Sequence, residues 1–545
     1  MRKSAFESYV VVSWMSASHG VSRRDLVKYA ACLGLSSLAR AATPYAADYP
    51  DPFTLGVASG DPLADGVVLW TRLAPELAGG PQLRDADFQV QWQLAHDKDF
   101  RRLKASGIAV AARQLAHSVH VEVDGLAPGT RYYYRFIAGG FTSATGRTKT
   151  LPAPRAGDPD TALRFATVSC QDYTQGYFHA YEHIASDELD LVIHLGDYIY
   201  DWPHKPGAVW GEPGYLRRHV VGHPRSLADF RELHSQYKLQ TELQRAHAAH
   251  PWIGLLDNHD GIEDSTAPKA RKQAAFQAYY EHMPVRLSGA PVLFEEGFKR
   301  HFVLDLGDLA RFVFLDTRQY KDPQGVCGAG EAPAIDGAYN TSIKPRCDLN
   351  HRPGRTMLGE RQRSWLLDAL AGSACRWNFM VTPCVMTPYD FKPPGGAHFL
   401  YGWDGYPEER KAILSHIEST NVSNPVFLSG DWHSFWVNQV RIPGLESRRA
   451  APAEFATTGL TSGYPGNPDL MRQSLQANPQ VQYLNVEDRG YVRFHLSAEM
   501  LEASCVAVDC TVRERGAART VARFKMPHRA VDSGSHTGPR VHRVA

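Results

Sequence analysis

The stretch from Asp190 to Asp201 reads DLVIHLGDYIYD, and it decides how the rest of the chain is interpreted. Its first half is mostly apolar and does not alternate, which is typical of a strand that is buried on both faces. Gly196 allows a tight exit from this strand, so that Asp197 lies at the sheet edge with Tyr200 close behind it. The pattern therefore predicts a binding site at the end of a buried strand.

Three further apolar segments end in the same kind of polar cluster. ALRFATVS is followed by Cys170, WIGLLD by Asn258 and His259, and NPVFLSG by Asp431 and His433. The carboxyl ends of strands in an open α/β sheet meet at one edge, so we expect these side chains to meet there too. Thiolate, imidazole, carboxylate and amide groups all bind metals. The predicted metal ligands are Cys170, Asp197, Tyr200, Asn258, Asp431 and His433.

Ordinary structural roles remain open for each of these groups. Asp197 could cap the turn that follows its strand, and Asp257 with Asn258 could form a turn of its own. Asp431 and His433 could be a surface pair. A single strand end of this kind would mean little, but four of them in one chain favour a shared metal site.

The surrounding pattern predicts an α/β catalytic domain over residues 161–530. Buried strands alternate with helical segments, as in βαβ units. One long helix is expected between Ser226, a favourable N-cap residue, and Pro251, which ends it. A β-hairpin is expected over residues 300–320, and antiparallel strands near the C-terminus.

The sequence pattern of residues 50–150 predicts a β-sandwich domain that precedes the catalytic domain. Apolar and polar residues alternate there between turns rich in Gly, Pro and Asp, and the segment LPAPRAGDPD forms a linker to the catalytic domain. The run GLAPGTRYYYRF, residues 125–136, resembles immunoglobulin and fibronectin type III domains, in which a tyrosine ties a corner loop to its strand. The domain contains no evident ligand cluster, so we expect it to support packing.

The N-terminus and the overall charge bear on location and partners. Residues 1–42 contain Arg23 and Arg24 before a short apolar stretch and the sequence Ala39-Arg40-Ala41, and they resemble a twin-arginine signal peptide rather than a basic amphipathic helix. A periplasmic or secreted enzyme is therefore expected. The 59 basic and 58 acidic residues indicate no nucleic-acid surface. No later segment has the roughly twenty apolar residues of a transmembrane anchor, and the oligomeric state is not determined.

Cysteine pairing is expected in an exported protein. Connectivity cannot be proved from spacing, but the partners that are near in sequence are Cys327 with Cys347, Cys375 with Cys384, and Cys505 with Cys510. Cys170 is left over, and its place at a strand end favours a thiolate with a chemical task over a small buried apolar residue.

As a whole, the chain resembles the alkaline phosphatase D family, or PhoD-like phosphatases. The resemblance runs from Phe53 to about residue 525 through the motifs LGVASGDPLADGVVLWTRL, SCQDY, HLGDYIYD, FVFLDTRQY, LGERQRSWL and SGDWHSFW. It implies an αββα metallophosphoesterase core behind an immunoglobulin-like domain, with Fe3+ and Ca2+ at the site. Iron would be bound by Cys170, Tyr200 and a bridging Asp197, and calcium by Asp197, Asn258 and Asp431, with His433 close by.

Ligand chemistry agrees with this assignment. Thiolate and phenolate donate strongly to trivalent iron, whereas carboxylate and amide oxygens suit a hard divalent cation. One position departs from the family pattern, in which Asp-Asp-His-Glu is usual where this chain has Asp257-Asn258-His259-Asp260. Asn258 removes a negative charge, so the identity of the second metal stays open.

The expected reaction is hydrolysis of a small phosphate ester by a hydroxide held between the two metals. His259 and His433 are candidate catalytic residues that stabilise phosphoryl oxygens or protonate the leaving group. A phospholipase D-like phosphodiesterase of the same fold is the alternative. A non-catalytic binding protein is disfavoured, because structural metal sites rarely leave open positions. The preference for a phosphate monoester or a phosphate diester depends on the walls of the substrate site, which we expect to be formed by residues 202–225, 322–357 and 387–408.

Overall fold

The computed structural model describes most of the chain outside the N-terminal segment. The described residues are 42–45, 49–153, 161–201, 216–262, 268–286, 294, 297–323, 343–391, 396–441, 451–528 and 540–544. The predicted signal peptide lies almost wholly outside them. Within the described residues, no helix is long and apolar enough to cross a membrane.

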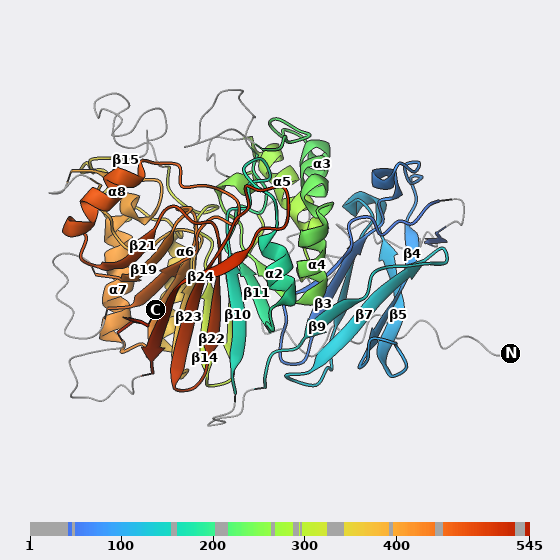
Figure 1. Ribbon diagram of the computed structural model, residues 1–545, viewed down its shortest axis with the longest axis horizontal. Coiled ribbons are helices and arrows are strands. Elements are labelled where there is room, and N and C mark those ends of the chain that lie inside the picture. Colours follow the sequence, from blue (N-terminus) through green and yellow to red (C-terminus); the bar gives the residue numbers. More distant parts are fainter. Residues whose placement is uncertain are drawn as a thin grey trace.

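A ten-stranded sheet forms the first layer of the core (Figure 1). Its strands β10, β11 and β12 are parallel neighbours. On its other side, β10 pairs with β22, and β22, β23 and β24 follow as antiparallel neighbours. In spatial order the strands are β25 (His542–Arg543), β24 (Ala518–Pro527), β23 (Met500–Val508), β22 (Gly490–Leu496), β10 (Leu163–Val168), β11 (Leu191–His194), β12 (Pro251–Gly254), β2 (Val57–Gly60), β3 (Val67–Arg72) and β6 (Ser118–Val123).

A seven-stranded sheet forms the second layer. The expected hairpin is present as β13 and β14, and β14, β16, β18 and β20 run parallel to one another. In spatial order the strands are β13 (Phe302–Leu306), β14 (Ala310–Phe314), β16 (Trp377–Val381), β18 (Pro425–Ser429), β20 (Ala453–Ala456), β19 (Phe435–Gln439) and β21 (Val481–Asn485). A small pair, β15 (Ile343–Lys344) and β17 (His398–Phe399), lies apart from it.

Side chains on alternate strand positions bind the layers together. Phe165 of β10 packs between the sheets against Phe312 and Phe379, whereas Ala166 faces the helices that cover the ten-stranded sheet. These helices are α2 (Ala180–Ser186), α3 (Leu227–Lys238), α4 (Thr241–Ala249) and α5 (Lys269–His282). Helices α6 (Glu360–Ala371) and α7 (Pro407–Ser419) cover the outer face of the seven-stranded sheet. The order helix, sheet, sheet, helix explains why the strands are apolar on both faces. The short helix α8 (Pro468–Ser474) lies beside β21 (Figure 1).

The prediction of a single long helix before Pro251 is wrong. The chain forms α3 and α4 instead, with Leu239 and Gln240 between them. Gln240 has an extended backbone that ends the helical hydrogen bonding, and its side chain accepts a hydrogen bond from Arg217 at 2.7 Å. Neither proline nor glycine marks this break, so only tertiary contacts distinguish it from a continuous helix.

The N-terminal strands are less separate from the catalytic domain than the sequence predicts. A six-stranded sheet contains β1 (Thr43–Pro44), β4 (Phe88–Ala95), β5 (Leu103–Ala111), β7 (Arg131–Ala138), β8 (Phe141–Thr142) and β9 (Gly146–Lys149). It packs on β3 and β6 across a common apolar core. However, β2 pairs in parallel with β12, so β2, β3 and β6 extend the catalytic sheet. At the predicted corner, the Tyr132 hydroxyl accepts a hydrogen bond from the Ala127 backbone at 2.9 Å.

Two of the three predicted disulfides are wrong. Cys375, Cys384, Cys505 and Cys510 are free and buried. Cys375 and Cys384 lie before and after β16, so an extended strand separates them. Cys505 belongs to the core between the sheets, whereas Cys510 contacts Arg489. Cys347 is disulfide-bonded, and its predicted partner Cys327 lies outside the described residues.

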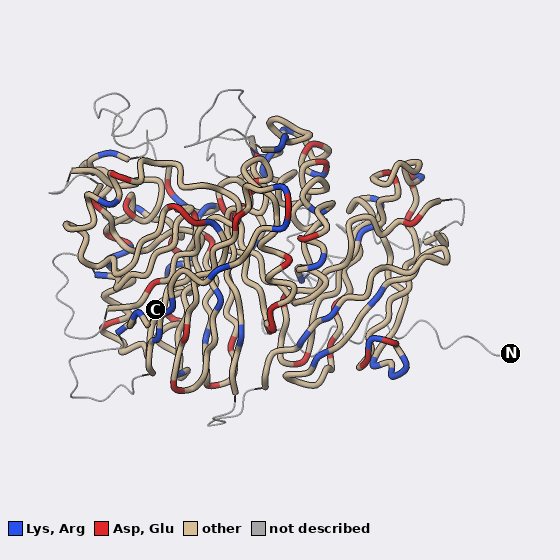
Figure 2. The backbone as a smooth tube through the Cα atoms, viewed as in Figure 1, with Lys and Arg blue, Asp and Glu red and all other residues tan. Residues whose placement is uncertain are grey.

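Acidic and basic residues are interspersed along the described backbone (Figure 2). The view contains no long run of one sign, in keeping with the nearly equal numbers of acidic and basic residues. The expected absence of a nucleic-acid surface stays a prediction.

Candidate metal centre

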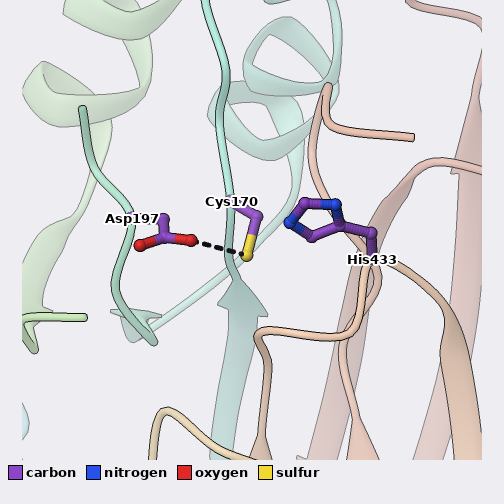
Figure 3. Close-up of side chains that lie close together, drawn as sticks. All are labelled: Cys170, Asp197 and His433. Atoms are coloured by element: carbon purple, nitrogen blue, oxygen red, sulfur yellow. Dashed lines mark hydrogen bonds between the residues drawn. The ribbon is translucent and has the colours of Figure 1, made fainter. Parts of the chain in front are cut away.

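Three of the predicted ligands lie close together where the two sheets meet. Cys170 follows β10, Asp197 follows β11, and His433 follows β18 of the other sheet; their side chains point toward one another (Figure 3). One ligand atom from each lies within 4.8 Å of the other two, and all three residues are buried. The Cys170 thiol donates to Asp197 Oδ2 at 3.5 Å. This grouping brings together residues up to 263 positions apart, as the strand-end pattern predicts.

Tyr200 completes this group. Its hydroxyl donates to Asp197 Oδ2 at 3.3 Å and lies 3.1 Å from His433 Nε2. Ser462 donates to the Tyr200 oxygen at 2.8 Å. Burial raises the pKa of Tyr200 well above its usual value, and the Ser462 hydrogen bond opposes this rise. The hydroxyl is therefore held by three neighbours and directed into the group.

The hydrogen bonds of His433 determine which ring nitrogen can accept a ligand. Nδ1 lies 2.9 Å from the carbonyl oxygen of Gly463, which can only accept a hydrogen bond. Nδ1 therefore carries the proton, and Nε2 presents its lone pair toward Tyr200. Burial lowers the pKa of His433 to about 4, although the Gly463 hydrogen bond opposes this shift. The ring is thus neutral near pH 7 and suited to ligation.

His259 takes a different position. Its ring stacks on Tyr200 with the centroids 4.4 Å apart, and its backbone N–H donates to Asp197 Oδ1 at 2.9 Å. Its Nδ1 lies 3.4 Å from Asp201, which also pairs with Arg271 at 2.5 Å. Burial alone would raise the pKa of Asp201, but His259 and Arg271 together lower it. His259 is therefore oriented by a charged carboxylate on one side of its ring.

Asn258 and Asp431 lie in a neighbouring cluster that is organised by Arg318. This arginine is wholly buried, pairs closely with Asp257, and lies 3.2 Å from Asp431 Oδ1. It also donates to Asn258 Oδ1 at 3.3 Å. The second carboxylate oxygens of Asp257 and Asp431 are buried and have no hydrogen-bond partner among the described residues. Two such oxygens beside an amide oxygen are suited to a hard cation.

Arg318 and Asp257 were not among the predicted site residues. Arg318 lies in FVFLDTRQY, four residues after the end of β14, at the same edge as the other strand ends. Applying the strand-end rule to the second sheet would therefore have found it. Asp257 was read only as a possible turn residue. Lys321 was missed as well, and its Nζ lies 3.7 Å from the ring centroid of Tyr401.

Burial makes negative charge unfavourable at several of these side chains. It raises the pKa of Cys170 and Asp197 well above their usual values, and the mutual repulsion of their charges adds to the effect on Cys170. It raises the pKa of Asp431 to about 6, although Arg318 opposes this rise. A bound cation favours the deprotonated forms and reverses these shifts. The donor set and its burial therefore fit a metal centre.

The backbone at the site is strained in a consistent way. Cys170, Asp197, Asp431 and His433 all have positive φ, at 51°, 56°, 69° and 48°. Such angles are uncommon for residues other than glycine, and they concentrate at functional sites. Each turns the chain sharply at its strand end, which lets the side chain point back over the sheet edge.

Comparisons with known proteins agree with this architecture. The family model described as PhoD-like phosphatase matches residues 165–505, and that of its N-terminal domain matches residues 39–152. Alkaline phosphatase D from Bacillus subtilis (strain 168) is 40% identical over 491 residues, which cover 87% of this chain and 80% of the relative. A solved structure of PhoD has a TM-score of 0.80 at 38% identity, covering 91% of this chain and 92% of that one. The chain therefore belongs to the PhoD-like phosphatase family and is a hydrolase of phosphoric ester bonds.

Proposed function

We propose that this phosphatase is metal-dependent and hydrolyses small phosphate esters at the centre formed by the strand ends. The observation that carries the proposal is the convergence of Cys170, Asp197 and His433, whose ligand atoms lie within 4.8 Å of one another. Burial of a thiol, a carboxyl and an imidazole at such distances is unfavourable unless they share a partner. A metal ion is the partner that suits all three.

Two cations are proposed, with different ligands. Cys170, Tyr200 and His433 would hold Fe3+, because thiolate, phenolate and imidazole favour a transition metal. Asn258 and Asp431 would hold Ca2+, with Asp257 as a further candidate, because their oxygens suit a hard cation. Asp197 is the proposed shared ligand, since Oδ2 contacts Cys170 and Tyr200 while Oδ1 accepts from the backbone N–H of His259, next to Asn258. The cations, when bound, supply the positive charge that stabilises developing negative charge on the phosphoryl group.

The residues around the metals have distinct proposed roles. Ser462 holds the oxygen of Tyr200 by a hydrogen bond that also stabilises the phenolate. His433 is assigned as a ligand rather than a general acid, because its Nδ1 proton is directed to Gly463. We propose that His259 either donates a proton to the leaving group or stabilises a phosphoryl oxygen. Asp201 stabilises the protonated form of this ring, which general acid catalysis requires.

Metal analysis of two ligand variants tests the proposal. Cys170→Ala and Tyr200→Phe are expected to lose most bound iron and at least about 100-fold in kcat, since both remove ligand atoms. Cys505→Ala and Tyr389→Phe are matched controls, because they remove a buried thiol and a buried phenol hydroxyl outside the metal centre; the Tyr389 hydroxyl bonds to Met471 and Ser474. Full iron content and turnover in both ligand variants would refute the assignment.

Substrate preference is tested by comparing a bis-substituted with a mono-substituted phosphate. The relatives described above are phosphatases and do not favour the phospholipase D-like alternative. We therefore expect cleavage of water-soluble phosphate esters without a requirement for a lipid chain. Faster hydrolysis of phospholipid vesicles than of either soluble ester would contradict this expectation.

We also propose export by the twin-arginine pathway and an immunoglobulin-like N-terminal domain. The first rests on the sequence of residues 1–42, and replacing Arg23 and Arg24 by Lys is expected to retain the protein in the cytoplasm. The second is supported by the Tyr132 corner and by the packing of two sheets across one core.

A further inference from the structure

The carboxylate of Asp260 connects two loops of the metal centre. Its oxygens accept hydrogen bonds from the backbone N–H groups of Asp197 at 3.0 Å, Tyr198 at 2.9 Å and Ile199 at 3.3 Å, all in the loop after β11. They also accept one from Asp257 at 2.8 Å, in the loop after β12. Asp260 is buried, so water cannot replace its carboxylate as the acceptor for these four N–H groups.

A hydrogen bond in the opposite direction closes the connection. The backbone N–H of His259, next to Asp260, donates to Oδ1 of Asp197 at 2.9 Å. This bond occupies Oδ1, and the other oxygen, Oδ2, receives the hydrogen bonds from Cys170 and Tyr200. The relative position of the two loops therefore determines which oxygen of Asp197 faces the metal centre.

The two loops also approach so closely that a side chain is excluded. A Cβ atom added to Gly196 would lie 2.4 Å from Cβ of Asp257, and Gly196 has a φ of +110°. Only glycine fits this position without moving the loop after β12. The close contact at Gly196 holds this pair of loops by steric fit, and the Asp260 hydrogen bonds hold the same pair through its carboxylate.

We propose that Asp260 is a positioning residue for the metal centre, which fixes the loop after β11 against the loop after β12 so that Asp197 and Asn258 can bind cations together. The inference rests on the proposed metal dependence. The four hydrogen bonds that Asp260 accepts all come from backbone N–H groups, and Asp260 is not assigned as a metal ligand. Its carboxylate is required because two oxygens accept from four donors, which a single amide oxygen cannot do.

Metal affinity tests this role apart from catalysis. Asp260→Asn is expected to weaken binding of iron and calcium, measured by equilibrium dialysis of the full chain, by about 10- to 100-fold, the usual effect of removing a group that orients ligands. Asp260→Glu keeps both acceptor oxygens and is expected to restore affinity to within a few-fold of the unaltered protein. Gly196→Ala serves as a second route to the same defect, because it displaces the loops and leaves the carboxylate intact.

Glu281→Gln is the matched control. Glu281 is a buried acid in α5 whose carboxylate pairs with Arg231 at 2.6 Å and accepts a hydrogen bond from Gln277, and neither partner belongs to the metal centre. It is expected to lower Tm without changing metal affinity. The positioning role is overturned if Asp260→Asn lowers Tm as Glu281→Gln does but binds metal as tightly as the unaltered protein, or if Asp260→Glu binds as weakly as Asp260→Asn. An unaltered protein that binds neither metal would instead overturn the proposed function.

Discussion

Replacing Arg318 by Met removes the positive charge that balances two buried carboxylates. Arg318 is wholly buried, pairs closely with Asp257, and lies 3.2 Å from Asp431. Methionine has a similar length and no charge, so packing is largely kept. In protein freed of metal by a chelator, Asp257 and Asp431 would then lack the guanidinium that pairs with both of them. The variant therefore measures the electrostatic role of Arg318 by itself.

The expected loss of stability follows from this burial. Removing one partner of a buried ion pair costs about 3–5 kcal/mol, because the remaining charge stays desolvated. For 545 residues, an unfolding entropy of about 2.1 cal/mol/K per residue gives about 1.1 kcal/mol/K. The loss corresponds to a decrease in Tm of about 3–5 °C. Calcium should raise the Tm of the variant more than that of the unaltered protein, since a cation can replace the guanidinium charge.

Differential scanning calorimetry at pH 8 checks both expectations. This pH lies above the pKa of about 6 to which burial raises Asp431 in the unaltered protein, so the ion pair with Arg318 that the variant removes is formed there. Arg311→Met is the matched control, because Arg311 pairs at 2.7 Å with the exposed Asp305, an interaction expected to contribute about 1 kcal/mol or less. Equal decreases in Tm for the two variants, or no added effect of calcium, would refute the reasoning.

Three further predictions concern other parts of the molecule. Burial lowers the pKa of His234 to about 3, so its neutral form stabilises the fold above pH 6.5 and this contribution is lost as pH falls toward 3. His234→Phe removes this dependence, so the free energy of unfolding of the variant relative to the unaltered protein should be about 1.4 kcal/mol higher at pH 5.5 than at pH 8, measured by urea unfolding. Tyr132→Phe should cost about 0.5–1.5 kcal/mol in the same assay, because the partly buried hydrogen bond from the Ala127 N–H loses its acceptor. Among the described cysteines, alkylation under denaturing, non-reducing conditions should leave Cys347 unlabelled and label the other five, which are Cys170, Cys375, Cys384, Cys505 and Cys510. A peptide that joins Cys375 to Cys384 would contradict the structure.

The strand ends show how far a local pattern reaches. Asp197 and Cys170 could be assigned to one edge from the sequence, because parallel strands must end on the same side of a sheet. Arg318 follows a strand of the other sheet, so the strand-end rule marks it as a candidate, but its pairing with Asp257 and Asp431 depends on how the two sheets pack. The sequence pattern does not contain that packing. Asp260 is a similar case, since its acceptor role appears only when the loop after β11 lies against it.

The apolar runs and their polar ends by themselves determined the α/β class, the buried strands and the residues that gather at the sheet edge, because burial on both faces and strand direction are local properties of the chain. Tertiary structure alone decided that β2 extends the catalytic sheet, that the helix breaks at Gln240, that Cys375 and Cys384 stay apart, and that Arg318 balances the acidic groups. These features depend on contacts between segments distant in sequence, whose energies no local pattern records.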